Sequence, residues 1–221
     1  MTHKIVSDFP RPDRRLVELF RDIPVANIDD NMERLAAVDA ALFPVNPTPL
    51  LGTAFTIRMP AGDNLMLHKA MDMAKPGDVI MIDAGGYMER AIFGELMATY
   101  CKTRGIAGIV CDGAVRDFDG LSRMTGFSVY ARGATPNGPY KNGPGEINVP
   151  VVIGGITVRP GDIVVGDADG LIVIDPLQAE DLARAARQTI EKEEQIMKDI
   201  LEKGEYIRPW VDEKIRSLGY T

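Results

Sequence analysis

Two apolar runs separated by one helical segment constrain the fold of this chain most strongly. "VIMIDAGG" and "IAGIVCDG" each have the pattern of a buried strand that ends in polar residues and glycine. Between them, "GELMATYCKTRG" has a helical pattern and closes with Gly105 at a C-cap position. Strand–helix–strand here, followed by consecutive short strands from "FSVYARG" onward, predicts a layered α/β fold with a mixed sheet.

The remaining segments fit one domain over residues 1–221. "RRLVELFRDI" and "DDNMERLAAVDAAL" are expected to be helices, the second with Asp29 or Asp30 as its N-cap. The expected parts are N-terminal helices at about 14–42, an α/β core at about 50–175, and a long C-terminal helix with its tail at about 176–221. A chain of this length can bury a sizeable core.

Charge and hydropathy exclude several function classes. The net charge is −7 and no Lys/Arg block stands out, so we expect neither nucleic acid nor a membrane as a partner. "MTHKIVSDFPRPDRR" lacks an apolar signal region, and no apolar run reaches membrane-spanning length. Cys101 and Cys111 lie in or beside apolar segments, which favours buried free thiols over a disulfide and therefore a reducing cytoplasm.

Several catalytic patterns are missing. With only His3 and His68, the sequence has no histidine-rich metal cluster and little scope for a Ser-His-Asp triad. His68 falls within an apolar helical segment, which favours a structural histidine. Neither a P-loop nor a GxGxxG after a strand is present, so no sequence motif indicates nucleotide binding.

The chemistry that remains lies at two strand ends, because ligands of open α/β sheets gather outside the carboxyl ends of strands. In "GIVCDGAVRD", a buried strand leads to Arg116 and Asp117, which offer a bidentate cation and a hard oxygen ligand for a divalent metal. Gly94 begins the preceding helix, whose unpaired N–H groups favour a carboxylate. These parts suit a small oxo-acid, and the alternative is a solvated Arg–Asp pair beside an unrelated helix start.

Other polar residues near these strand ends are open to more than one interpretation. Asp83 and Asp112 are expected to orient the loops. Arg90 is equally compatible with contact to substrate or to a neighbouring subunit, or with solvation. "YKNGPGEINVPVVIGG" has the composition of a conformationally fixed loop. We expect this loop to lie near the site.

The segment "DAGGYMERAIFGELMATYCKTRGIAGIVCDGAVRD" resembles the signature region of the 4-hydroxy-4-methyl-2-oxoglutarate aldolase family, which also contains the regulators of ribonuclease activity A. The resemblance extends from about "VANIDDNMERL" to the C-terminal helix. It implies a β/β/α swivelling-domain fold assembled as a homotrimer or as a pair of trimers. It also implies cleavage of 4-hydroxy-2-oxo acids to pyruvate, with decarboxylation of oxaloacetate.

The resemblance also implies roles for individual residues. The backbone of Gly94, Glu95, Leu96 and Met97 would hold the pyruvyl carboxylate of the substrate, and Arg116 would bind the substrate as well. Asp117 would bind the metal, and Glu95 would contact metal-bound water.

One acidic residue of the implied site comes from the C-terminal helix of a neighbouring subunit. We expect Glu193 there, with Glu191 and Glu194 as alternatives. One protein carboxylate with open positions for water and substrate suits Mg²⁺ or Mn²⁺. The alternative function, implied by the regulator members, is a binding protein that inhibits a ribonuclease. The physiological 4-hydroxy-2-oxo acid stays open at this point.

Overall fold

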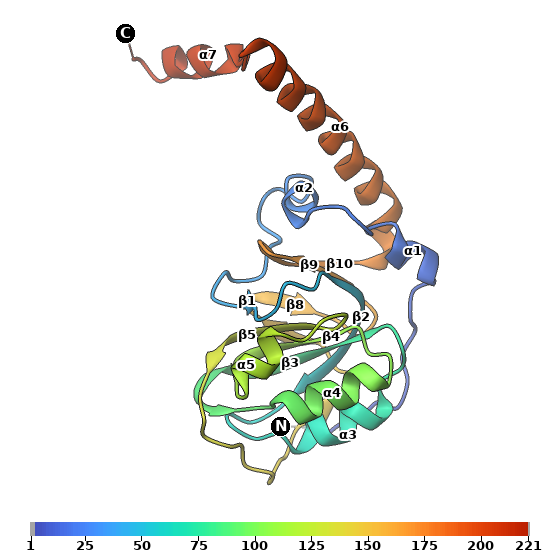
Figure 1. Cartoon of the computed structure of the whole chain (residues 1–221). Coiled ribbons are helices and arrows are strands. Elements are labelled where there is room, and N and C mark those ends of the chain that lie inside the picture. Colours follow the sequence, from blue (N-terminus) through green and yellow to red (C-terminus); the bar gives the residue numbers. More distant parts are fainter. Residues whose placement is uncertain (1–2, 221) are drawn as a thin grey trace.

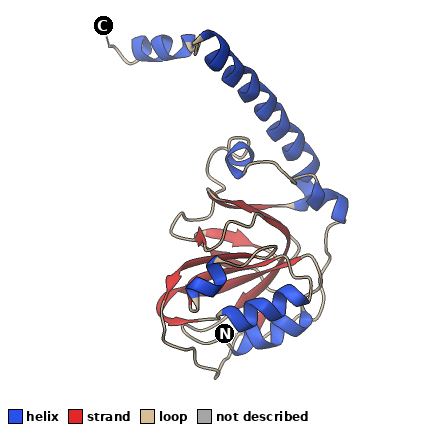
Figure 2. Cartoon of the chain, in the orientation of Figure 1, coloured by secondary structure: helices blue, strands red, loops and turns tan. Residues whose placement is uncertain are grey.

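A mixed sheet organises the computed structural model, which describes residues 3–220 (Figures 1 and 2). The strand order is β1-β5-β4-β3-β2-β9-β10, with β6 paired to β2, and β7 and β8 form a separate hairpin. Strands β2, β3, β4 and β5 run parallel to one another, whereas β1, β6, β9 and β10 pair antiparallel with their neighbours. The strands are β1 (Phe43–Pro44), β2 (Leu50–Arg58), β3 (Asp78–Ala91), β4 (Gly108–Val115), β5 (Ser128–Ala134), β6 (Glu146–Ile147), β7 (Val151–Ile153), β8 (Ile156–Val158), β9 (Ile163–Asp167) and β10 (Gly170–Ile174).

Helices cover one face of the parallel strands and the β7–β8 hairpin covers the other. Within β3, Ile80 and Ile82 pack in the core on the helical side, whereas Val79 and Met81 pack in the core that includes the hairpin. This alternation is the two-residue period of a strand buried on both faces. The predicted β/β/α layering with a mixed sheet is therefore confirmed. The helices are α1 (Arg14–Glu18), α2 (Val25–Asp29), α3 (Leu65–Met73), α4 (Glu95–Thr103), α5 (Phe118–Ser122), the 3₁₀ turn η1 (Pro176–Gln178), α6 (Ala179–Lys203) and α7 (Pro209–Ser217).

The N-terminal region corrects one sequence-based expectation. The predicted helices across 14–42 reduce to the short helices α1 and α2, and "DDNMERLAAVDAAL" does not form a helix. Glu33 and Arg34 adopt left-handed backbone angles (φ 60° and 59°), which stop a right-handed helix, and Ala37 forms a bridge to Ile172. Asp29 is the last residue of α2 rather than an N-cap.

A second correction concerns β3. The sequence places its end at Asp83 to Gly86, but the strand continues to Ala91 after a break in register that follows Ile82. Gly85 and Gly86 have φ values of 66° and 69°, which residues other than glycine rarely adopt.

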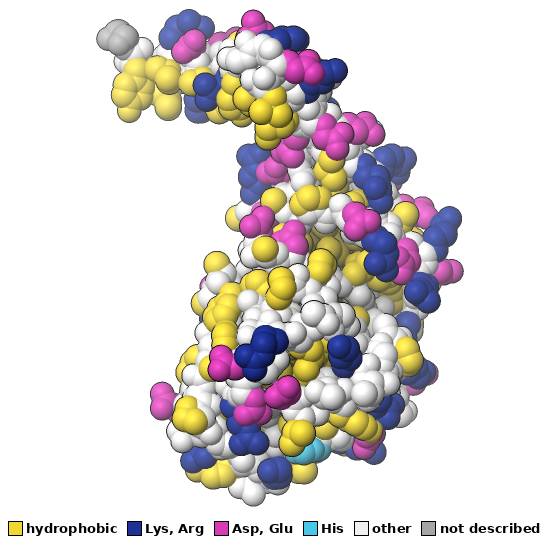
Figure 3. Space-filling model, viewed as in Figure 1, with side chains coloured by type: hydrophobic (Ala, Val, Ile, Leu, Met, Phe, Trp, Pro, Cys, Tyr) yellow, Lys and Arg dark blue, Asp and Glu magenta, His cyan; other side chains and the backbone are white. Residues whose placement is uncertain are grey.

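The predicted long C-terminal helix is present as α6, which leaves the body of the molecule and ends at Gly204 with φ 67°. Its buried side chains are all in the first eight residues, Ala179 to Ala186, and α7 has none. Apolar side chains gather on the far part of this C-terminal arm (α6 and α7), among them Leu201, Ile207 and Trp210 (Figure 3). No helix within residues 3–220 combines the length and hydropathy needed to cross a membrane.

Candidate active site at the start of helix α4

Backbone pairing brings the start of α4 beside the end of β4. The N–H of Ile92 donates to the carbonyl of Ala114 at 2.8 Å, and the N–H of Arg116 donates to the carbonyl of Phe93 at 3.0 Å. Strand β3, which precedes α4, and strand β4 finish at the same edge of the parallel sheet. The residues that follow them therefore meet there, as the sequence indicates.

Gly94 is in direct contact with Asp117. A Cβ built on Gly94 would lie 2.1 Å from the Oδ2 atom of Asp117 and 3.0 Å from the Cγ atom of Arg116. The same Oδ2 atom accepts a hydrogen bond from the N–H of Glu95 at 3.1 Å. Asp117 itself has left-handed backbone angles (φ 56°, ψ 41°), a conformation that aspartate adopts more readily than most residues. Only glycine at position 94 permits this approach.

The first turn of α4 still has free hydrogen-bond donors. Within residues 3–220, the N–H groups of Leu96 and Met97 have no backbone or side-chain acceptor. Both residues line a cavity of about 290 Å³ together with Gly94, Arg116 and Asp117, and we call this cavity the α4 pocket. Free N–H groups and the helix dipole favour an anion at this position.

The two side chains of greatest chemical interest are accessible to solvent. Arg116 and Asp117 are each 47% exposed, and the Nε of Arg116 lies 3.9 Å from the Oδ2 of Asp117. This separation is too long for a hydrogen bond, so the guanidinium remains available to a ligand. The carboxylate of Glu95 lies against Gly120, where a built Cβ would be 2.3 Å from Oε2.

The structure does not bring Glu193 into the α4 pocket of its own chain. Glu193 is exposed on α6 and accepts a hydrogen bond from the side-chain amide of Asn27 at 2.6 Å. Glu191 and Glu194 are also exposed on this helix. Figure 1 places α6 and α4 at opposite ends of the molecule. A role for α6 in the site therefore requires a second subunit.

Asp83 lies within β3, at the break in register, and Asp112 lies within β4; neither lines the α4 pocket. Asp112 binds the guanidinium of Arg132 and accepts the N–H of Gly154, in the β7–β8 turn, at 3.0 Å. Burial raises the pKa of Asp83, although Gly85 donates its N–H to this carboxylate. These aspartates therefore stabilise loops on the hairpin side of the sheet.

Both cysteines are buried free thiols, as predicted. Burial raises the pKa of Cys101 to about 12, and it also raises the pKa of Cys111. Neither thiol is therefore suited to nucleophilic chemistry.

Sequence reasoning missed three residues of the α4 pocket: Asn64, His68 and Lys141. Asn64 is the N-cap residue of α3, and its type before an apolar helical run was the available signal. His68 is exposed on α3 and lines the pocket, whereas the sequence favoured a structural histidine at this position. Lys141 belongs to the loop "YKNGPGEINVPVVIGG", which the sequence indicated as lying near the site.

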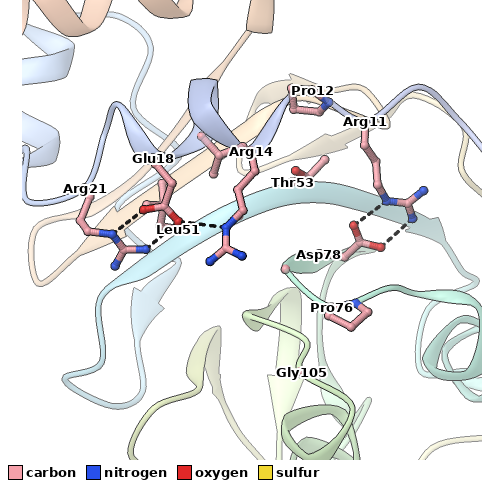
Figure 4. A pocket seen from close by; sticks show the side chains of 13 residues that line it. Arg11, Pro12, Arg14, Glu18, Arg21, Leu51, Thr53, Pro76, Asp78 and Gly105 are labelled. Atoms are coloured by element: carbon pink, nitrogen blue, oxygen red, sulfur yellow. Dashed lines mark hydrogen bonds and ion pairs between the residues drawn. The ribbon is translucent and has the colours of Figure 1, made fainter.

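Another cavity, of about 420 Å³, lies at the amino ends of β2 and β3 and is lined by several arginines (Figure 4). Arg11 donates two hydrogen bonds to the carboxylate of Asp78, at 2.8 and 2.7 Å. Arg21 forms two hydrogen bonds to Glu18, and Arg14 also lies near this carboxylate. The arginine charges are therefore already neutralised, and we do not assign a ligand here.

The described part of the chain offers few side-chain ligands for a divalent metal. Within residues 3–220 there is no group of three or more His, Cys, Asp or Glu side chains that could hold a metal ion. Asp117 offers one exposed carboxylate beside the free first turn of α4. This donor set fits Mg²⁺ or Mn²⁺, which take oxygen ligands and keep several waters.

Comparison with known proteins gives a consistent result. Residues 25–173 match the RraA-like family model, described as Aldolase/RraA. A protein of Halalkalibacterium halodurans named "Putative 4-hydroxy-4-methyl-2-oxoglutarate aldolase" is 40% identical over 197 residues, covering 89% of this chain and 93% of that protein.

Solved structures show the same fold. An uncharacterised protein from Pseudomonas syringae has a TM-score of 0.75 at 24% identity, covering 88% of this chain and 96% of that chain. Streptomyces coelicolor RraAS2, described as an unusual member of the RNase ES inhibitor RraA protein family, has a TM-score of 0.75 at 26% identity. That match covers 85% of this chain and 98% of the other.

Proposed function

Since the chain belongs to the Aldolase/RraA family, we propose that it is a divalent-metal-dependent lyase that cleaves 4-hydroxy-2-oxo acids, such as 4-hydroxy-4-methyl-2-oxoglutarate, to pyruvate. We extend the proposal to decarboxylation of oxaloacetate, which passes through the same pyruvate enolate. The observation that carries it is the placement of Arg116 and Asp117 beside the free N–H groups of the first turn of α4.

In the proposed reaction, the N–H groups of Leu96 and Met97 hold the carboxylate next to the 2-oxo group. Cleavage of the C3–C4 bond leaves its electron pair on the three-carbon fragment as an enolate, and the guanidinium of Arg116 stabilises the enolate oxygen. A metal held by Asp117 would supply additional positive charge at that oxygen.

Loss of the proton from the C4 hydroxyl must accompany cleavage of the bond. Glu95, in the first turn of α4, and Glu193 of a neighbouring subunit are proposed to hold the water that accepts this proton. Positioned acid–base catalysis of this kind contributes about 10²–10⁴ in rate. Protonation of the enolate at C3 then gives pyruvate. Decarboxylation forms the same enolate without removing a hydroxyl proton, so it does not need this base.

The proposal requires a homo-oligomer, a trimer or a pair of trimers, in which the C-terminal arm reaches the α4 pocket of a neighbour. Two observations support it: Glu193 is remote from the α4 pocket of its own chain, and the far part of the arm exposes apolar side chains such as Leu201 and Trp210 (Figures 1 and 3). Large exposed apolar patches mark contact surfaces in soluble proteins.

The shared site can be tested by complementation. Arg116→Ala and Glu193→Ala should each be poor aldolases. When their subunits exchange, the intact Arg116 of one variant meets the intact Glu193 of the other, and aldolase activity must return. If mass measurements show exchange but no activity returns, the catalytic carboxylate lies within a single chain.

The function itself is tested by measuring pyruvate release from a panel of 4-hydroxy-2-oxo acids with and without Mg²⁺ or Mn²⁺. We expect chelation to abolish turnover and metal to restore it. Full turnover in excess EDTA would refute the metal-dependent mechanism. Trapping of the substrate on a lysine by borohydride would replace it with a Schiff-base mechanism.

A second candidate function follows from the solved structure described as belonging to an RNase ES inhibitor family. Under this alternative the chain binds and inhibits a ribonuclease. A regulator does not need the carboxylates of Glu95 and Asp117 for catalysis. Inhibition of a ribonuclease by a protein that releases no pyruvate from any acid of the panel would favour this alternative.

A further inference from the structure

The α4 pocket contains more positive charge than one carboxylate and one oxo group require. Besides Arg116, it is lined by Lys141 and by His68 of α3, whereas Asp117 is its only acidic lining residue within the described part of the chain. The ammonium of Lys141 and the imidazole of His68 have no hydrogen-bond or ion-pair partner among residues 3–220. A free ammonium and an unpaired imidazole in the pocket of a chain with net charge −7 point to an anionic ligand that accepts hydrogen bonds.

Lys141 is carried by a loop whose backbone is fixed on both sides of it. On one side, the buried carboxylate of Asp63 accepts the N–H groups of Asn142 and Gly143, the second at 2.9 Å. The N–H of Leu65 at the start of α3 donates to the other oxygen of this carboxylate. The loop is thereby tied to the helix that carries His68.

On the other side of Lys141, Arg90 holds the loop. Its guanidinium donates to the carbonyl of Gly138 and to the hydroxyl of Tyr140, both at 2.8 Å, and stacks 3.9 Å above the Tyr140 ring. Arg90 is therefore occupied by the loop, whereas Lys141, between Tyr140 and Asn142, keeps its charge free. A fixed backbone on both sides reduces the entropy lost when a ligand binds this side chain.

We propose that Lys141, together with the imidazole of His68, binds a second carboxylate of the substrate, at the end remote from the 2-oxo group. This inference rests on the proposed function, in which the first carboxylate and the oxo oxygen occupy the first turn of α4 and Arg116. The substrate named above, 4-hydroxy-4-methyl-2-oxoglutarate, is a diacid, and this subsite would bind its C5 carboxylate. Lys141 and His68 are specificity residues, because they contact the part of the substrate that does not react.

Binding of non-reacting analogues tests the inference separately from catalysis. 2-Oxoglutarate has both carboxylates but no C4 hydroxyl, and 2-oxopentanoate replaces the second carboxylate by a methyl group. By titration calorimetry with Mg²⁺ present, the wild-type protein should bind the diacid about tenfold to a hundredfold more tightly, the range for a hydrogen-bonded charge pair. Lys141→Gln should remove most of this preference and leave the affinity for 2-oxopentanoate within about twofold. His68→Gln should remove a smaller part.

Lys69→Gln is the matched control, because Lys69 is exposed on α3 next to His68 but does not line the α4 pocket. It should leave the preference unchanged. Equal affinities of the wild type for the two analogues, or a preference retained in Lys141→Gln, would overturn the subsite. Such a result combined with pyruvate release by the wild type would leave the proposed function intact. A lysine-dependent preference without pyruvate release would instead support the subsite and contradict the lyase.

Discussion

Gly94→Ala should disable the active site while leaving the fold almost unchanged. The new Cβ would lie 2.1 Å from the Oδ2 of Asp117, and a normal contact requires this carboxylate to retreat by about 1 Å. Retreat also disturbs the hydrogen bond from the N–H of Glu95 to Asp117. Misplacement of a reacting group by about 1 Å costs about 10²-fold in rate, so kcat/KM for pyruvate release should fall by that factor.

The effect of this substitution on stability should be small. Gly94 has extended backbone angles (φ −144°, ψ −163°) that alanine adopts freely. Alanine is a poorer N-cap than glycine, but it also reduces the entropy of the unfolded chain, so the net change should stay within about 1 kcal/mol. For a domain of this size, 1 kcal/mol corresponds to a Tm change of about 2–4 °C.

The assay combines pyruvate-release kinetics, Mn²⁺ titration and thermal unfolding. Mn²⁺ affinity should fall together with kcat/KM. Gly133→Ala is the control, because its Cβ would meet only the flexible end of Met88. A Gly94→Ala enzyme with kcat/KM within about threefold of the wild type would refute the assignment of Asp117 as a metal ligand placed by Gly94. A loss of activity explained by unfolding would refute it equally.

Three further predictions follow from the same structure. Gly120→Ala would place a Cβ 2.3 Å from the Oε2 of Glu95, so aldol cleavage should fall more than oxaloacetate decarboxylation, and equal losses would contradict the role of this carboxylate. Arg116→Ala should lose both activities because it removes enolate stabilisation, whereas Glu193→Ala should retain much of the decarboxylation; steady-state kinetics on both substrates separate the two. The thiol of Cys101, with its pKa raised to about 12, should not react with a thiol reagent at pH 8 until the protein unfolds. Rapid labelling of the native protein would show that Cys101 is accessible to solvent.

The α/β core was predictable because its signals are local. Buried strands such as 108–115 appear as uninterrupted apolar runs, and Gly94 and Gly105 bracket α4 at the positions where a helix start and stop are expected. Since the carboxyl ends of parallel strands share one edge of the sheet, the clustering of Gly94 with Arg116 and Asp117 could also be predicted.

The failures have long-range causes. The segment after α2 has helical periodicity, but Ala37 pairs with Ile172 of β10, far away in sequence, and this pairing outweighs local propensity. Contacts between segments distant in the sequence, such as that of Gly120 with Glu95, produce no local sequence pattern that would predict them. Lys141 reaches the α4 pocket because the buried Asp63 fixes its loop, and no local pattern could show this pairing.

Within residues 3–220, the part of α6 beyond Glu193 makes no side-chain hydrogen bond to the body of the molecule, and neither this part nor α7 buries a side chain. Helical segments of fewer than about 12–15 residues are marginal in water on their own. In the proposed oligomer, mass action would govern the order of this arm: subunit association would stabilise it, and dilution would favour local unfolding. Because the contacts of α6 with the body of the molecule end at Glu193, a dilute protein should become protease-sensitive just after this residue. It should also lose aldol cleavage before decarboxylation, so that protein concentration selects between the two reactions.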